Sequence, residues 1–190
     1  MLQAFVFNEL AVVVRHWYEV APFDEEHGTR LELRRRLRYP HRGSESASQP
    51  VGLDGLLWRV DLFDRIGDPP GSLRRAHHHM NLNDTEPIGR DYDDELTADP
   101  FGWTESRLSE LSRLLDELGV ELHDRHDEIA DVRRALPSIM SVARSFAPDR
   151  CDSPARCLEA TRDTTDIVRM MTTQFRDSPT DPRSQARGWP

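Results

Sequence analysis

Three consecutive histidines, His77 to His79, are the residues whose type and spacing best suit chemistry in this sequence. If the segment 73–82 (LRRAHHHMNL) is a β-strand, successive side chains point to opposite faces, so His77 and His79 share one face. His78 then points into the core. Imidazole titrates near neutral pH, so two such rings on one face can act as general acid and general base on a phosphodiester. The same pair could instead bind a metal ion, or belong to a solvated polar face.

Arginine is the second feature, because all 25 cationic side chains of the chain are arginine and none is lysine. Residues 29–42 hold six arginines and one glutamate, a local charge of 6 − 1 = +5. Residues 83–131 hold four arginines and sixteen acidic residues, a local charge of 4 − 16 = −12. The formal charge of −9 therefore hides a basic segment, which can attract an anionic partner locally.

We expect these arginines to line the same sheet face as the histidines, if each strand turns its polar side the same way. The candidate substrate-binding residues are Trp17, Arg34, Arg36, Arg38, Arg59 and Arg75. Guanidinium groups bind phosphate oxygens in a bidentate manner, and an exposed tryptophan can stack on a base. Alternatively, the arginines pair with the acidic segment and hold the sheet to the helices.

Other metal or catalytic motifs are weak. His123 and Asp127 are four residues apart and would share one side of a helix, but the sequence supplies no third ligand. Cys151 and Cys157 lack the close spacing of a zinc or redox site. The chain has no phosphate-binding glycine loop, serine-hydrolase elbow or zinc-protease helix motif. We therefore predict no metal site and no cofactor.

The hydrophobic pattern predicts an α+β fold in which the strands come first. Alternation or β-branched composition predicts strands at 11–20, 29–39, 56–63 and 73–82, and their short connections favour a four-stranded antiparallel meander. Three helices follow, at 104–118, 129–146 and 154–175, each with apolar residues at helical spacing.

These elements divide the chain into an α+β domain at 1–119, a helical extension at 120–176 and a disordered tail at 177–190. The extension packs on the domain or on a partner. The longest apolar run, Leu10 to Val14, is far shorter than the roughly 20 residues of a membrane helix. No signal-peptide pattern is present either, so we expect a cytoplasmic protein that does not contact membranes.

The order of several short motifs resembles a small family of bacterial domains that is similar to the TumE-type toxins of toxin–antitoxin pairs. These motifs are RHWYEV, LELRRRLRYP, LLWRVDLFDR, RRAHHHM and DPFGW, all within residues 10–119. The resemblance implies a ribonuclease-like toxin with His77 and His79 in its site and an antitoxin as its partner. The long helical extension and the acidity of this chain depart from that pattern.

Two functions follow as hypotheses. The first is an RNA-directed, metal-independent nuclease-like protein of toxin–antitoxin or defence type, with His77 and His79 as acid and base and arginines that stabilise the phosphate charge. The alternative is a non-catalytic interaction protein, an antitoxin, adaptor or self-associating chain, whose acidic amphipathic helices bind a basic partner or a second copy.

Overall fold

A computed structural model describes residues 2–20, 25–37, 52–80, 82–83, 86–87 and 89–147. One antiparallel sheet contains β1 (Leu2–Val6), β2 (Leu10–Val20), β3 (Glu25–Leu37), β4 (Gly52–Arg65) and β5 (His77–His79), which neighbour one another in chain order. Two short strands, β6 (Leu82–Asn83) and β7 (Glu86–Pro87), pair separately. The helices are α1 (Asp94–Ala98), α2 (Pro100–Ser109), α3 (Leu111–Glu117) and α4 (Arg125–Phe146). The predicted α+β class is confirmed.

The sheet has one more strand than expected, because residues 2–6 also pair, with β2. The strand predicted at 73–82 is shorter, since only residues 77–79 pair with β4. The helix predicted at 104–118 begins at Pro100 instead and is interrupted at Glu110. Thr104 lies inside α2, and the side chain of Asp99 caps that helix by accepting a hydrogen bond from the N–H of Gly102.

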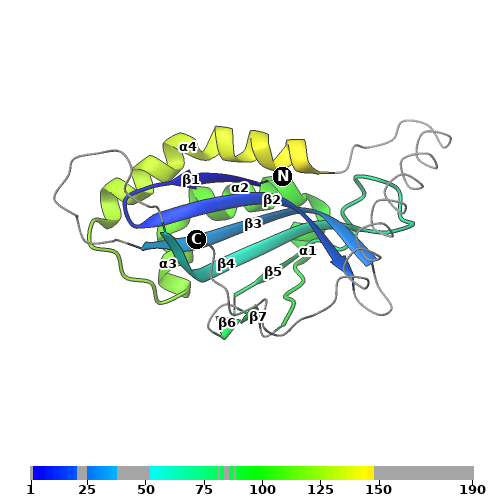
Figure 1. The fold of residues 1–190 in the computed structure, drawn as a ribbon, viewed down its shortest axis with the longest axis horizontal. Helices are drawn as coiled ribbons and strands as arrows, with labels where there is room; N and C mark the ends of the chain where they lie inside the picture. Colours follow the sequence, from blue (N-terminus) through cyan, green and yellow to red (C-terminus); the bar gives the residue numbers. More distant parts are fainter. Residues whose placement is uncertain are drawn as a thin grey trace, which may run out of the picture.

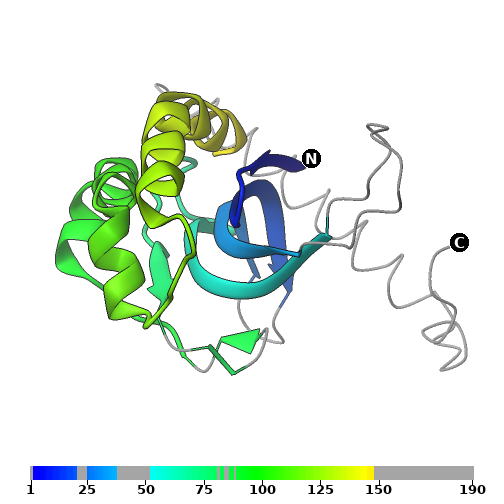
Figure 2. The same cartoon turned by 90° about the vertical axis from the view of Figure 1, so that its left-hand side faces the viewer.

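The four helices lie together on one face of the sheet, and Figures 1 and 2 show the other face turned away from them. Alternation explains this arrangement, because the core side chains of the central strands point to the helical side, namely Val12, Val14, Leu31, Leu33, Trp58, Val60 and Leu62. Val14 lies opposite Leu31, which lies opposite Val60, and all three are fully buried. They form one core with the leucines of α2 and α3.

Helix α4 belongs to the same core and not to a separate body. Val132, Ile139 and Ala143 are fully buried in the cluster that contains the sheet residues. The Thr29 hydroxyl of β3 also donates to the backbone oxygen of Ala143 over 2.8 Å. The predicted extension therefore packs on the sheet as far as residue 147, whereas the predicted third helix and tail lie outside the described residues. No described helix has the length and apolar character needed to cross a bilayer.

Two glutamates join the start of α4 to the turn between β1 and β2. The buried Glu128 carboxylate accepts hydrogen bonds from the backbone N–H groups of Glu9 and Leu10, at 2.8 and 2.6 Å. The Glu9 carboxylate accepts in return from the N–H groups of His123 and Asp124, at 3.1 and 2.9 Å. The turn and the helix terminus thus satisfy each other's unpaired backbone donors.

Glu128→Ala removes the acceptor of two backbone N–H groups, so we expect the free energy of unfolding to fall by about 2–3 kcal/mol. Glu128→Gln keeps one acceptor oxygen and should lose less. Urea denaturation measures both variants. Glu121→Ala, at an exposed position nearby, is the control and should change stability by no more than about 0.5 kcal/mol; an equal loss in both alanine variants would contradict the assignment.

A small aromatic group lies at the far end of β2 and β3. The rings of Tyr18 and His27 are stacked with centroids 5.8 Å apart, and the ring of His16 lies 5.8 Å from that of His27. Burial, reinforced by the neighbouring His16, lowers the pKa of His27 to about 4. The folded state therefore favours neutral His27.

Because the pKa of His27 is lower in the folded than in the unfolded state, its stabilising contribution is complete above about pH 6.5 and is lost as the pH falls toward 4. We expect a loss of about 2 kcal/mol between pH 7.5 and 4.5 from this residue. His27→Gln cannot titrate and should flatten this part of the stability–pH curve, measured by urea denaturation. Identical curves for the two proteins would refute the assignment.

Candidate functional site

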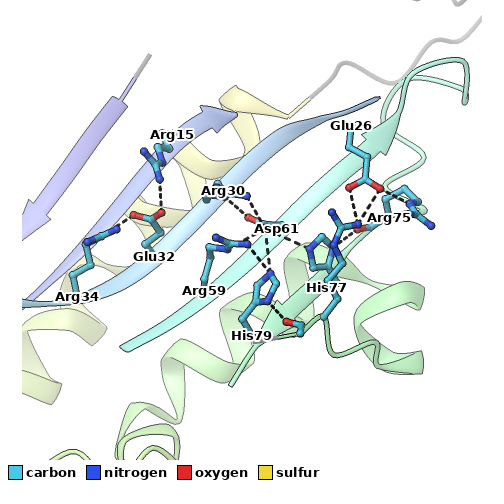
Figure 3. A network of polar contacts seen from close by, with 12 residues as sticks. Arg15, Glu26, Arg30, Glu32, Arg34, Arg59, Asp61, Arg75, His77 and His79 are labelled. Carbon is cyan, nitrogen blue, oxygen red and sulfur yellow. Dashed lines mark hydrogen bonds and ion pairs between the residues drawn. The ribbon is translucent and has the colours of Figure 1, made fainter. Parts of the chain in front are cut away.

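The face of the sheet turned away from the helices carries the charged side chains of β2, β3 and β4 (Figure 3). Alternation places them there, because Arg30, Glu32 and Asp61 occupy the positions between the core residues of their strands. Their side chains are at most 5% exposed. We call this surface the arginine face.

Three carboxylates on the arginine face each lie between two arginines. Glu32 pairs with Arg15 and Arg34, Asp61 with Arg30 and Arg59, and Glu26 with Arg75 and Arg90. In these contacts six guanidinium groups meet three carboxylates. These three carboxylates come from β3 and β4, and not from the acidic segment 83–131.

Asp61 is the centre of the densest part of this network. The guanidinium of Arg30 makes two contacts with it, Nε to Oδ1 at 2.6 Å and Nη2 to Oδ2 at 3.0 Å, and Arg59 Nε lies 3.1 Å from Oδ2. Asp61 is fully buried, which by itself raises the pKa of its carboxyl group. Hydrogen bonding with His77 and His79 and the charge of Arg30 outweigh burial, so the pKa of Asp61 lies well below its ordinary value.

His77 and His79 point from β5 toward Asp61, with each Nε2 atom 3.4 Å from its Oδ2 oxygen. Both Nδ1 atoms face backbone oxygens, of Arg75 and Gly89 respectively. A carbonyl oxygen only accepts, so each Nδ1 carries a hydrogen, and the reactive nitrogen of each ring is Nε2.

The two Nε2 atoms have different surroundings. The Nε2 of His79 lies 2.9 Å from Arg59 Nη2 as well as 3.4 Å from Asp61 Oδ2, so it contacts both a guanidinium and the carboxylate. The Nε2 of His77 is buried and faces Asp61 Oδ2 at 3.4 Å.

Asp61, His77 and His79 also have the residue types of a metal site, and one ligand atom from each lies within 4.8 Å of the others. Their charges oppose this use. The Asp61 oxygens are already bound by Arg30, and the Arg59 guanidinium stands where a cation would meet His79. A divalent ion would add two positive charges to a buried site that already has an excess of one. The arrangement therefore suits an anion better than a metal ion.

The connection between β4 and β5 brings the histidines back to Asp61. Asp64 accepts hydrogen bonds from the N–H groups of Gly71 and Leu73, both at 2.5 Å, and from the Ser72 hydroxyl at 2.9 Å. Leu73 has a φ of 49°, a left-handed conformation that a side chain disfavours and that these bonds hold in place. This turn shortens the expected strand to three residues.

A second segment, residues 89–92, lies against the outer side of β5. The backbone groups of Asp91 exchange two hydrogen bonds with His78, at 3.0 and 2.9 Å. The ring of Tyr92 lies 5.7 Å from that of His77, and Gly89 binds His79. His77 and His79 are 0% and 2% exposed, so this segment contributes to a closed site.

The structure places the predicted binding residues in different surroundings. Arg34, Arg59 and Arg75 contact the carboxylates of the arginine face, as described above. Trp17 lies on that face, with the guanidinium carbons of Arg15 and Arg30 each 4.4 Å from a ring centroid of its indole, so two cations already engage it.

The structure corrects the prediction for Arg36. The register between β3 and β4 shifts on either side of Arg34, and Arg36 donates to the backbone oxygen of Phe7 over 2.9 Å and makes none of the carboxylate contacts described above. It lines a hollow with Asp131 and Arg134 of α4, away from the site. Arg38 lies outside the described residues, as do Cys151 and Cys157. His123 and Asp127 are both exposed and form no three-ligand group with other described residues.

Sequence reasoning missed the acidic half of the site, namely Glu26, Glu32 and above all Asp61. A signal for Asp61 was present, since it falls between Val60 and Leu62 in a strand whose neighbouring residues are apolar. A carboxylate on the polar side of such a strand, two residues from Arg59, indicates an ion pair.

The comparisons add no relative: no family model, no curated protein and no solved structure matches this chain. The resemblance to the TumE-type toxins stays a prediction, and the interpretation of the site rests on its geometry.

Asp61→Ala leaves two guanidinium groups buried without their carboxylate, so we expect the free energy of unfolding to fall by about 3–5 kcal/mol. Glu117→Ala is a matched control, because Glu117 also lies between two arginines, Arg107 and Arg113, but on the exposed surface. It should change stability by no more than about 1 kcal/mol. Urea denaturation of both variants tests the difference; equal losses would contradict it.

Proposed function

We propose that the arginine face binds RNA and that the cluster around Asp61 cleaves a phosphodiester bond of the bound strand. One observation carries this proposal: two imidazoles of fixed tautomer converge with two guanidinium groups on one buried carboxylate. Buried titratable groups held together in this way are typical of catalytic sites, although structural ion pairs also produce them. The excess positive charge of the face supports an anionic substrate.

The two histidines differ in a way that suits acid–base cleavage. His79 in its neutral form would accept the proton of a ribose 2′-hydroxyl as its oxygen bonds to phosphorus. His77, beside the Asp61 carboxylate, would donate its proton to the 5′-oxygen as the bond from phosphorus to that oxygen breaks. The products are a 2′,3′-cyclic phosphate and a 5′-hydroxyl end. The guanidinium groups of Arg30 and Arg59 would stabilise the charge on the phosphate during transfer.

Binding of a phosphate requires some rearrangement, because both histidines are covered. A phosphodiester oxygen is an acceptor like the oxygens of Asp61, so it can compete for the donors of Arg30 and Arg59. The segment 89–92 contributes to the cover over His77 and His79 and would have to open. This cover explains how the chain could hold a cleavage site that is silent until RNA engages the arginine face.

The test is cleavage of a labelled single-stranded RNA by the full chain in the presence of a chelator. We expect His77→Ala and His79→Ala to lower the cleavage rate by about 10²–10⁴-fold, the usual contribution of a general acid or base. His123→Ala replaces an exposed histidine outside the site and should leave the rate unchanged. Thermal unfolding checks that each variant is folded.

Binding is measured separately with the same strand lacking 2′-hydroxyl groups, which cannot be cleaved by this route. It should bind the histidine variants within a few-fold of the original chain, while Arg34→Gln should weaken binding and lower the slope of log K against log salt by about 0.7. Wild-type protein that leaves RNA intact, or equal cleavage by all variants, would end the proposal for catalysis. Retained salt-dependent binding would then leave RNA binding alone.

A further inference from the structure

The edge strand β1 presents unpaired backbone groups. Within the described residues β1 pairs only with β2, so its other side is open. At the opposite edge, β5 exchanges backbone hydrogen bonds with Asp91. Among the described residues, another segment covers the edge of β5 and none pairs with the outer edge of β1.

The pairing pattern shows which residues of β1 face the open side. Phe7 donates its N–H to the backbone oxygen of Leu10 over 2.9 Å, so this pair is hydrogen bonded. In an antiparallel ladder such pairs recur at every second residue, which directs the backbone groups of Phe5 and Gln3 toward β2. The N–H and C=O groups of Leu2, Ala4 and Val6 consequently point outward.

The side chains along this edge carry none of the features that discourage association. The strand reads LQAFV, without charge, proline or glycine. Leu2 and Val6 are 60% and 39% exposed. Among the large hydrophobic side chains of the described residues they rank first and third, with Tyr92 at 57% between them. Leu2, Ala4 and Val6 also share one face of the strand, because they alternate with Gln3 and Phe5.

We propose that β1 pairs with β1 of a second copy of this chain, antiparallel about a two-fold axis at Ala4. In this register Ala4 lies opposite its counterpart, and Leu2 of each copy lies opposite Val6 of the other. The three outward-facing residues of each strand then exchange backbone hydrogen bonds, and their side chains form one apolar cluster across the axis. The two sheets become one continuous sheet.

Several features favour a second copy over another occupant. The outward-facing residues are complementary to themselves, since Leu2 and Val6 fall at equal distances on either side of Ala4. An uncharged edge also gives a chain of formal charge −9 a place where two copies meet without bringing like charges together. The paired strands are short, so we expect association that depends on protein concentration, in contrast to an obligate dimer.

Sedimentation equilibrium of the full chain over a concentration series tests this inference. We expect a monomer–dimer equilibrium, and Ala4→Pro should raise its dissociation constant by at least about tenfold, because it removes the two central hydrogen bonds of the pair. The N–H of Ala4 makes no bond to β2, so this substitution spares the internal ladder. Ala4→Val keeps the N–H and is the matched control, with a dissociation constant within a few-fold of the original.

Leu2→Arg provides a second variant that leaves the backbone intact, and it should weaken the dimer by a similar factor by placing charge on the edge. In a mixture of isotope-labelled and unlabelled chains, methyl groups of Leu2 should show a nuclear Overhauser effect to Val6 of the other copy. A wild-type chain that stays monomeric throughout would overturn the proposal, and so would a dimer insensitive to both substitutions. A monomer that binds an extended peptide at β1 would identify a different occupant and would also reject the second copy.

Discussion

The bidentate contact between Arg30 and Asp61 is the interaction on which the arginine face depends. Both side chains are removed from water, so neither charge would be stable in its position without the other. Their strands pair in register, with Arg30 directly opposite Asp61, and the core residues on the other side of the sheet fix that register. The same carboxylate then orients His77, His79 and Arg59. Hydrophobic alignment of β3 with β4 thus determines the electrostatics of the site.

The sequence was informative wherever alternation ran without interruption. The two-residue period of a strand separates the buried Leu31 and Leu33 from Arg30, Glu32 and Arg34. It also places His77 and His79 on one face with His78 on the other. The sequence pattern failed at Arg36, whose side chain donates to the backbone oxygen of Phe7, a contact distant in sequence that alternation does not predict. It also overlooked β1, whose pattern is too short to distinguish from an apolar terminus.

Other features could not be predicted because they depend on contacts distant in sequence. The shortening of β5 follows from the Asp64 carboxylate binding the turn at Leu73, and no local propensity announces it. The pairing of each carboxylate with two arginines depends on which strands are neighbours. The link between Glu128 and the turn at Leu10 spans 118 residues, so it follows only from the packing of α4 on the sheet. Local sequence patterns predict which face of a strand or helix a residue occupies, but they do not predict which faces pack against each other.

Separation of charge makes an acidic chain compatible with the anionic substrate that we propose. The helical layer carries the acidic segment, and on that side His78 lies beside Trp103 in a cleft of about 580 Å³ whose rim includes Glu95 and Glu110. These carboxylates lie on the far side of the sheet from the arginine face, and packed layers are about 10 Å apart. Exposed charges beyond a Debye length of about 8 Å at physiological salt contribute little. The field that a phosphate meets near Arg59 is therefore set by the arginine face itself, and net charge alone is a poor guide to the partner of this protein.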